Sequence, residues 1–437
     1  MLLIHVPKLT NRLGYTLNVL FKHVLHADFG ITTDEEHFLA YGDAKLSYGP
    51  RRIADCPHIK SCSLLFETLI EEQEPRPFCH DGQWMLFPVY SRDADLPFDL
   101  VAATFYMVSR YEEYLPLRTD EHGRFEPEDC LAVQTGFADE PVVDQWALML
   151  RQLIADRYPD FVWPARRYRF VQTVDIDAAW CYRHKGLFRT VMGTLRDLLV
   201  RRDPAEVKRR IRVLAGREAD PFDTFDYIIE RNKHIAGGKL IFFALIADYD
   251  QYDKPSSYHN NHTRDLLQHL DDYASMGIHP GYHSLEQPHN VDLETRRLEG
   301  ILHRTISKSR YHFLRLKLPT SYRTLLHAGL TDDYTMGYHD RTGFRAGISK
   351  PYPFYDLDRD EETALTIHPF CVMDTTLQRY LKLSPEAGIE RYKQLINNLR
   401  RVDGTFCCII HNQNLCELYG WQGWRDVYEQ MLELAKP

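Results

Sequence analysis

The sequence predicts an α/β protein, in which a parallel sheet covered by helices forms a barrel or near-barrel behind an N-terminal α+β domain. From about residue 168 onward, apolar strand-like runs alternate with helix-like runs over about 270 residues. Such alternation is typical of parallel sheets with helical cover. Residues 1–162 lack this order, because turn-rich segments interrupt short strand-like and helix-like pieces there.

We therefore expect two domains, 1–162 and 163–437, separated near the proline-containing segment 158–168. The clearest helix of the first domain is 99–115, where apolar residues recur at spacings of three and four. In the second domain, the predicted strands are 169–176, 239–247, 277–280, 311–318, 332–338, 364–373 and 405–412. The predicted helices are 220–238, with an acidic start and a glycine stop, followed by 262–277, 290–309, 319–329 and 385–404.

Composition and charge exclude several classes of protein. The 437 residues are 26% charged and 44% hydrophobic, as in ordinary globular proteins. A net charge of −9 argues against a nucleic-acid partner. None of the nine cysteines forms a C-x-x-C pair, so neither a zinc ribbon nor a disulfide framework is indicated. The apolar run 240–247 is too short for a transmembrane segment, and the N-terminus lacks signal-peptide features, so we expect a cytoplasmic protein.

One insertion, 183–217, follows the first strand of the second domain. It holds eleven Lys and Arg residues against three acids, and its apolar residues make it amphipathic. A helical hairpin with a solvated basic face is the simpler interpretation. The alternative is peripheral contact with an anionic membrane surface or a polyanionic substrate.

Two carboxylates stand at alternate positions at the end of strand 169–176. Asp175 and Asp177 therefore project to the same face. Burying two unpaired carboxylates side by side is costly. A cation between them, or an arginine paired with one of them, would remove this cost.

Two histidines follow a later strand end, in the segment G-I-H-P-G-Y-H-S. His279 is followed by Pro280, which suits the first position of a helical turn, and such a turn would bring His283 to the same side. Two histidines and one carboxylate, with open positions for water, form a hydrolytic zinc arrangement.

Two further segments complete the set of candidates. Arg345 lies in a glycine-containing loop and could orient one of the carboxylates. His411 ends the apolar strand 405–412 and is a candidate general acid.

These four segments, in this order, resemble the motifs of the polysaccharide deacetylases, carbohydrate esterase family 4. They read T-V-D-I-D (173–177), H-P-G-Y-H (279–283), F-R-A-G (344–347) and I-I-H-N (409–412), with V-M-D (372–374) before the last. The resemblance covers roughly 170–420. The first domain resembles an uncharacterised domain that precedes such deacetylase domains in some bacterial proteins.

The resemblance implies a distorted (β/α) barrel and a divalent metal, usually Zn²⁺. By position, the implied metal ligands are Asp177, His279 and His283. The implied catalytic groups are Asp175 as general base, Arg345 orienting that base, His411 as general acid, and Asp374 tuning the arginine or the histidine. The two aspartates are adjacent in the family's motif, whereas one residue separates them here, and this leaves open which of them binds metal.

The implied function is metal-dependent removal of N-acetyl groups from a saccharide or a lipid-linked glycan precursor. One alternative is a metal-dependent amidohydrolase that acts on another amide, such as a small cyclic one. The other is a catalytically silent glycan-binding or scaffold protein, which would have no need for metal ligands, acid and base together.

Overall fold

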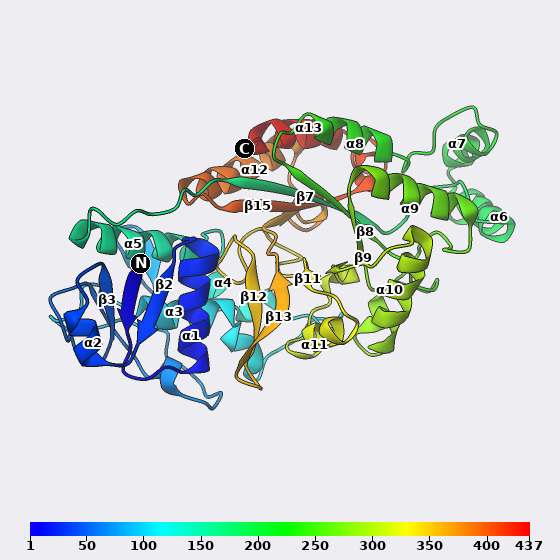
Figure 1. The fold of residues 1–437 in the computed structure, drawn as a ribbon. Helices are drawn as coiled ribbons and strands as arrows, with labels where there is room; N and C mark the ends of the chain where they lie inside the picture. The colour runs from blue at the N-terminus through cyan, green and yellow to red at the C-terminus, as the bar shows by residue number, and fades with distance from the viewer.

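The computed structural model describes residues 1–437 and is a mixed α/β structure with two main sheets (Figure 1). The first sheet has the order β2-β1-β3-β4, and all its ladders are parallel. Its strands are β1 (Leu2–His5), β2 (Phe29–Thr32), β3 (Lys45–Gly49) and β4 (His58–Lys60). Antiparallel pairing in this region is limited to the small hairpin of β5 (Phe78–His80) and β6 (Gln83–Met85) and two isolated bridges, Pro88–Phe98 and Thr119–Phe125.

Five helices accompany the first sheet: α1 (Asn11–Asn18), α2 (Glu35–Ala40), α3 (Leu100–Val108), α4 (Leu131–Thr135) and α5 (Val142–Arg157). Helix α3 corresponds to the predicted helix 99–115 but is shorter. It begins where the Asp99 carboxylate accepts hydrogen bonds from two backbone N–H groups. It ends before Arg110, whose φ of 54° is left-handed.

The second sheet has nine strands in the order β12-β13-β11-β10-β9-β8-β7-β15-β14. Every ladder is parallel except β12–β13. The strands are β7 (Arg169–Ile176), β8 (Lys239–Ala244), β9 (Ser275–Ile278), β10 (Lys308–Ser309), β11 (Asp332–Asp333), β12 (Tyr352–Asp356), β13 (Glu361–Ile367), β14 (Val372–Met373) and β15 (Thr405–His411). This pairing establishes a largely parallel sheet with helical cover, and it does not by itself establish a closed barrel.

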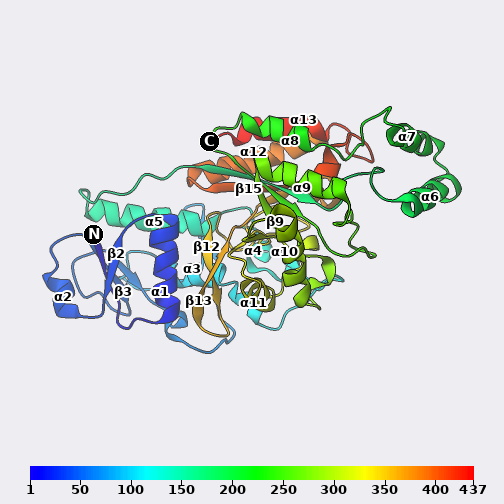
Figure 2. The ribbon, with the colours of Figure 1, turned by 45° about the vertical axis from the view of Figure 1, so that its right-hand side comes forward.

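The helices of the second region are α6 (Leu187–Arg196), α7 (Pro204–Leu214), α8 (Phe225–Lys233), α9 (Asn261–Tyr273), α10 (His289–Leu302), α11 (Thr320–His327), α12 (Pro385–Arg401) and α13 (Trp424–Ala435). Helices α8, α12 and α13 lie on one side of β7 and β15 (Figures 1 and 2). Helices α6 and α7 extend away from the rest of the molecule. No helix is both long and apolar enough to cross a bilayer.

The predicted strand 311–318 is wrong. The strand at this place is β10, which is only two residues long and ends before Arg310. The chain then turns through a 3-10 segment, His312–Leu314, in which Phe313 and Leu314 have positive φ. Alternating apolar residues therefore mimicked a strand in a segment whose backbone is bent. The predicted strand 364–373 is likewise two strands, β13 and β14, with Pro369 between them.

The two regions share one continuous apolar core and are joined by buried polar contacts. The Tyr15 hydroxyl donates to the Pro353 carbonyl at 2.9 Å. Glu113 accepts two hydrogen bonds from Arg345, at 2.9 and 2.7 Å, and one from Arg110 at 2.7 Å. Burial alone would raise the pKa of Glu113, but the two guanidinium groups lower it below its ordinary value. All three side chains are buried, so this cluster clamps the first region to the second.

We predict that Glu113→Ala destabilises the protein strongly, because it leaves the buried Arg345 guanidinium without a carboxylate and removes one of the two carboxylates that pair with Arg110. Breaking a buried ion pair on one side typically costs about 3–5 kcal/mol. The measurement is the shift of the urea unfolding midpoint. Glu390→Ala is the matched control, since its pair with Lys393 is exposed and is expected to contribute less than about 1 kcal/mol. Equal shifts for the two variants would contradict the clamping role.

Candidate active site with a metal centre

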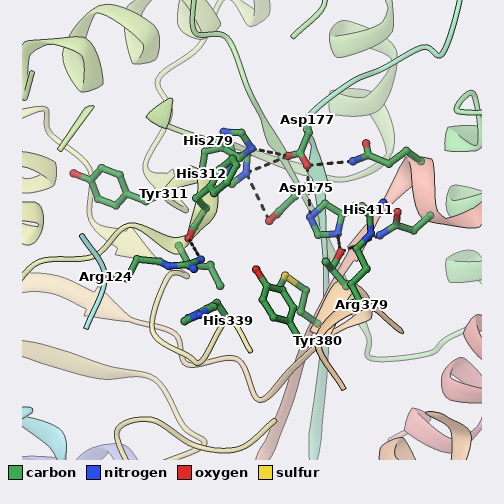
Figure 3. Close-up of a pocket in the computed structure, with 16 residues that line it drawn as sticks. Arg124, Asp175, Asp177, His279, Tyr311, His312, His339, Arg379, Tyr380 and His411 are labelled. Atoms are coloured by element: carbon green, nitrogen blue, oxygen red, sulfur yellow. Dashed lines mark hydrogen bonds and ion pairs between the residues drawn. The ribbon is translucent and has the colours of Figure 1, made fainter. Parts of the chain in front are cut away.

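Polar side chains gather where several strands of the second sheet end. Asp177, His279 and Asp374 directly follow β7, β9 and β14, and His411 is the last residue of β15. Because these strands are parallel, their carboxyl ends meet at one edge of the sheet. Asp177, His279 and His411 line a cavity of about 330 Å³ (Figure 3).

Asp175 is paired with an arginine that the sequence did not reveal. The Arg310 guanidinium donates to Asp175 Oδ1 at 2.8 Å, to Thr173 Oγ1 at 2.7 Å and to the Tyr334 carbonyl at 2.9 Å. Arg310 is fully buried, so these bonds fix its position. The other oxygen of Asp175, Oδ2, lies 3.8 Å from His279 Nε2 on the cavity side.

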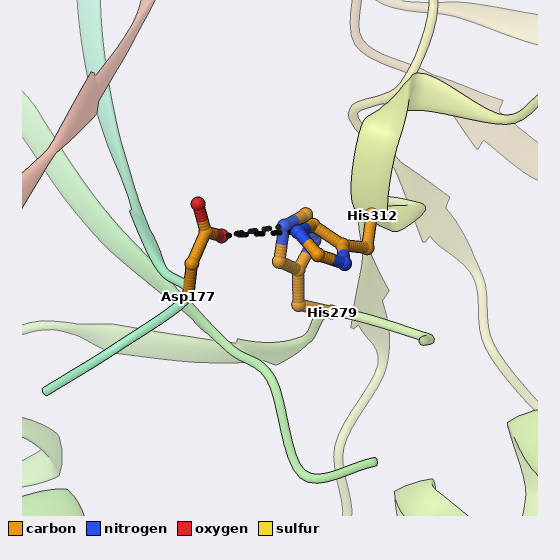
Figure 4. Close-up of side chains that lie close together, drawn as sticks. All are labelled: Asp177, His279 and His312. Atoms are coloured by element: carbon orange, nitrogen blue, oxygen red, sulfur yellow. Dashed lines mark ion pairs between the residues drawn. The ribbon is translucent and has the colours of Figure 1, made fainter. Parts of the chain in front are cut away.

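Asp177, His279 and His312 form a cluster whose side chains could hold a metal ion (Figure 4). Asp177 Oδ1 lies 3.5 Å from His279 Nε2 and 3.6 Å from His312 Nε2. The three ligand atoms all lie within 4.8 Å of one another. The ligand atoms around a tetrahedral zinc ion are about 3.4 Å apart, given bonds of about 2.1 Å.

Both imidazoles of this cluster are oriented by a hydrogen bond on their far side. His279 Nδ1 donates to the Arg310 carbonyl at 2.5 Å, and His312 Nδ1 donates to Asp253 Oδ1 at 2.6 Å. Since Nδ1 carries the proton in each neutral ring, Nε2 keeps a free lone pair directed at Asp177. This combination of a carboxylate or carbonyl behind each histidine is typical of metal ligands in proteins.

The Asp177 carboxylate fits a cation for an independent reason. Its Oδ1 is buried and has no hydrogen-bond partner, although it points at two imidazole nitrogens. Burial would raise the pKa of Asp177, but the protonated His411 beside it holds that pKa well below its ordinary value. An unsatisfied, ionised oxygen facing two lone pairs is the donor set expected for a divalent ion.

His411 is held by Asp374. The carboxylate accepts from His411 Nδ1 at 2.7 Å and from the His411 backbone N–H at 2.8 Å, and it also accepts from Asn414 at 2.9 Å. His411 Nε2 faces the cavity and lies 3.7 Å from Asp177 Oδ2. Burial would lower the pKa of His411, but the carboxylates of Asp374 and Asp177 raise it to about 10. This histidine is therefore protonated near neutral pH.

The structure places His283 outside the cluster, which corrects its sequence-based assignment as a ligand. His283 Nε2 lies 2.9 Å from Asp250 Oδ2, and its side chain is 45% exposed. Histidines four residues apart share a face only when the backbone between them is a regular helix or strand. After Pro280 the chain is extended at Gly281 and then forms the 3-10 turn Tyr282–Ser284, so that relation is lost. His312, from the next strand end, lies where the second imidazole was expected.

Arg345 also differs from the sequence-based expectation. It donates to Glu113, as described above, and does not contact Asp175. Arg310 is the residue that pairs with this carboxylate. The local signal for Arg310 was weak, because it follows a strand of only two residues.

The first region of the chain supplies part of the cavity wall. Arg124 lines the cavity beside His339, on the side away from Asp177 (Figure 3). Its guanidinium donates to Asp120 at 2.7 Å and to the Phe313 carbonyl at 3.0 Å. Burial and the adjacent Arg124 lower the pKa of His339 to about 4, so this wall carries a neutral imidazole and one fixed positive charge.

Comparisons with known proteins give one family match and several structural likenesses. Residues 2–159 match the model of a family of unknown function, DUF7033. No curated protein matches the chain significantly.

Among solved structures, a protein assigned as a polysaccharide deacetylase from Mycobacterium smegmatis has a TM-score of 0.38 at 15% identity, covering 62% of this chain and 85% of its own. A protein assigned as a polysaccharide deacetylase involved in O-antigen biosynthesis, from Bordetella bronchiseptica, has a TM-score of 0.31 at 14% identity, covering 61% and 81%. A 7,8-dihydropteroate synthase from Vibrio fischeri has a TM-score of 0.30 at 7% identity, covering 62% and 91%. TM-scores this low do not support assigning the activities of those proteins to this chain. A function therefore has to be inferred from the geometry of the site.

We predict that His312→Ala and His279→Ala each lose the bound divalent ion, whereas His283→Ala retains it, because only the first two present a nitrogen to Asp177. Elemental mass spectrometry of the purified proteins measures the metal content. His283→Ala is the matched control, since it removes the same side chain from the neighbouring segment. Metal lost from His283→Ala but kept by His312→Ala would support the ligand set expected from spacing.

We further predict that Asp253→Asn weakens metal binding without abolishing it. The amide can still accept the His312 Nδ1 hydrogen bond, but it lacks the charge that makes the imidazole a better ligand. Losing such a partner typically weakens metal affinity by about 10–100-fold. Competition with a fluorescent chelator measures the change. An affinity equal to wild type would mean that Asp253 does not support the ligand.

Proposed function

We propose that the chain is a metal-dependent hydrolase that removes N-acetyl groups from a saccharide. The observation that supports this is the convergence, on one cavity, of a metal-binding cluster, a free carboxylate oxygen and a protonated histidine. Hydrolysis of an amide needs a base to activate water, stabilisation of the oxyanion, and an acid to protonate the departing amine. The groups around this cavity offer each of these.

Asp177, His279 and His312 would hold the ion, which would lower the pKa of water and polarise the amide carbonyl when bound. Asp175 is the base in this scheme. Arg310 occupies its Oδ1 and offsets its charge, which leaves Oδ2 to accept a proton from water. His411 is the acid, because Asp374 fixes its Nδ1 and its protonated Nε2 faces the cavity. It would donate this proton to the departing amine.

The lining of the cavity supports an acetylated sugar as the substrate. Leu314 and Met373 provide an apolar surface that suits an acetyl methyl group. Tyr380 lines the same cavity and is 46% exposed, so its ring can receive the apolar face of a saccharide. The order of the T-V-D-I-D and I-I-H-N segments, which resembles that of polysaccharide deacetylases, favours an N-acetylated sugar over other amides.

We predict that Asp175→Asn lowers turnover by about 10²–10⁴-fold while the metal content stays unchanged. The amide cannot take a proton from water, but the ion's ligands remain in place. The measurement is acetate release from an oligosaccharide of N-acetylhexosamine, with metal content determined on the same samples.

His411→Gln is expected to give a similar loss of turnover and likewise to retain the metal. Glu390→Ala, far from the cavity, serves as the control with wild-type turnover. Wild-type turnover in Asp175→Asn would rule out its role as the base. If the wild-type protein binds the metal, releases no acetate and cleaves another amide, the protein is an amidohydrolase with a different substrate.

A further inference from the structure

The basic insertion forms a hairpin that stands apart from the body of the protein. It consists of α6, the π-helical segment Asp197–Arg201, and α7, and it projects outward in both views (Figures 1 and 2). Helix α6 buries none of its side chains. An amphipathic helix whose apolar face is largely exposed is unusual in a folded protein.

Large apolar side chains are concentrated on this hairpin. Phe188 is 78% exposed, Leu199 is 71% exposed and Val200 is 75% exposed. Of the 23 large apolar side chains that are exposed in the whole chain, ten belong to the hairpin. These ten, which we call the apolar face of the hairpin, are Leu187, Phe188, Val191, Met192, Leu195, Leu198, Leu199, Val200, Ile211 and Leu214.

The hairpin is held together by polar contacts that leave this apolar face outside. Asp197 is buried and pairs with Arg201 in its own segment and with Arg210 in α7, and the second pair ties the two helical segments together. The exposure of the apolar face is therefore a feature of the folded hairpin.

The base of the hairpin is anchored in the same way. The Asp220 carboxylate accepts three backbone hydrogen bonds, from residues 181–183. Glu206 accepts from the hydroxyls of Tyr182 and Tyr419 at 2.6 and 2.8 Å. The hairpin is thus fixed to the body at its base while its apolar face stays uncovered.

The charge of the hairpin is opposite to that of the chain. Its exposed basic residues are Arg196, Arg201, Arg202, Lys208 and Arg212, whereas Asp203 is its one exposed acid. Arg196, Arg202 and Lys208 have no carboxylate within ion-pair distance. The whole chain has a net charge of −9. A local excess of positive charge beside an uncovered apolar face is the pattern of helices that lie in the interface of an anionic membrane.

We propose that the 187–214 hairpin docks this protein on an anionic lipid surface. Its apolar face would enter the boundary between headgroups and acyl chains, while the exposed arginines and lysine contact the lipid phosphates. A symmetric dimer through this surface fits less well, because two such hairpins would bring like charges together.

The hairpin also lies at the same end of the sheet as the cavity. Strand β7 carries Asp175, and the chain continues through Asp177 into the hairpin. Docking through the hairpin would therefore hold the cavity near the lipid surface. This proposal stands on the hairpin alone and does not depend on the proposed hydrolase activity.

The test is co-sedimentation of the full-length protein with vesicles of phosphatidylcholine, with and without phosphatidylglycerol. We expect binding only to the vesicles that contain phosphatidylglycerol, and we expect added salt to weaken it. An apolar variant, Leu187→Ser with Phe188→Ser, Leu199→Ser and Val200→Ser, should lose binding. A charge variant, Arg196→Gln with Arg202→Gln and Lys208→Gln, should weaken it at least about tenfold.

Matched controls carry the same kinds of change at exposed sites elsewhere. Leu39→Ser with Leu69→Ser, and Lys8→Gln with Lys382→Gln and Arg401→Gln, should bind vesicles as the wild type does. Absence of vesicle binding in the wild type, or unchanged binding in both hairpin variants, would overturn the proposal. A second copy of the chain would be the occupant if light scattering showed a wild-type dimer that does not bind vesicles and an apolar variant that is monomeric. That result would also overturn the proposal. Equal binding to neutral vesicles would overturn the assignment to an anionic surface.

Discussion

Two carboxylates at the end of β7 face one cavity, and the arrangement of the site follows from how each charge is compensated. A buried charge is tolerated only when partners offset it. Asp175 has a permanent partner in Arg310, which is itself fixed by Thr173 and the Tyr334 carbonyl. Asp177 has no such partner and keeps an unsatisfied oxygen beside His279 and other imidazoles. Because Arg310 pairs with Asp175, Asp177 is the carboxylate that remains available to bind a cation. The spacing of the two acids alone does not show this.

The cavity depends on both regions of the chain. Arg345 is a residue of the second region, yet its carboxylate partner Glu113 lies 232 positions earlier in the chain. Arg124 reaches the cavity wall from the first region and is tied to the Phe313 carbonyl beside His312. The first region therefore both holds the loop of Arg345 and supplies part of one side of the cavity.

The sequence predicts the parts of this site that obey strand periodicity. The alternation of strands and helices indicates the mixed α/β architecture, and the period of two indicates that Asp175 and Asp177 share a face. The long apolar strand 405–412 also points to His411 at its end, and the short strand-like segment 277–280 contains His279. Strand periodicity does not predict that Arg310 and His312 belong to the site. The strand before them, β10, has only two residues, and the apolar alternation of 311–318 continues through a bent backbone. The pair of Arg345 with Glu113 has no local signal, since it depends on how two distant segments pack.

His283 and His312 show why spacing alone misleads at such a site. A sequence interval specifies a spatial relation only when the backbone between the two residues is regular. Between His279 and His283 the chain leaves the strand and turns through Gly281. The interval of four therefore does not place the two side chains on one face. His279 and His312 lie at the ends of the neighbouring parallel strands β9 and β10, where adjacency in the sheet brings their side chains together whatever the length of the connecting helix. In a parallel sheet, strand order is therefore a better guide to metal ligands than residue spacing, and it is the order β10-β9-β8-β7 that joins His312, His279 and Asp177.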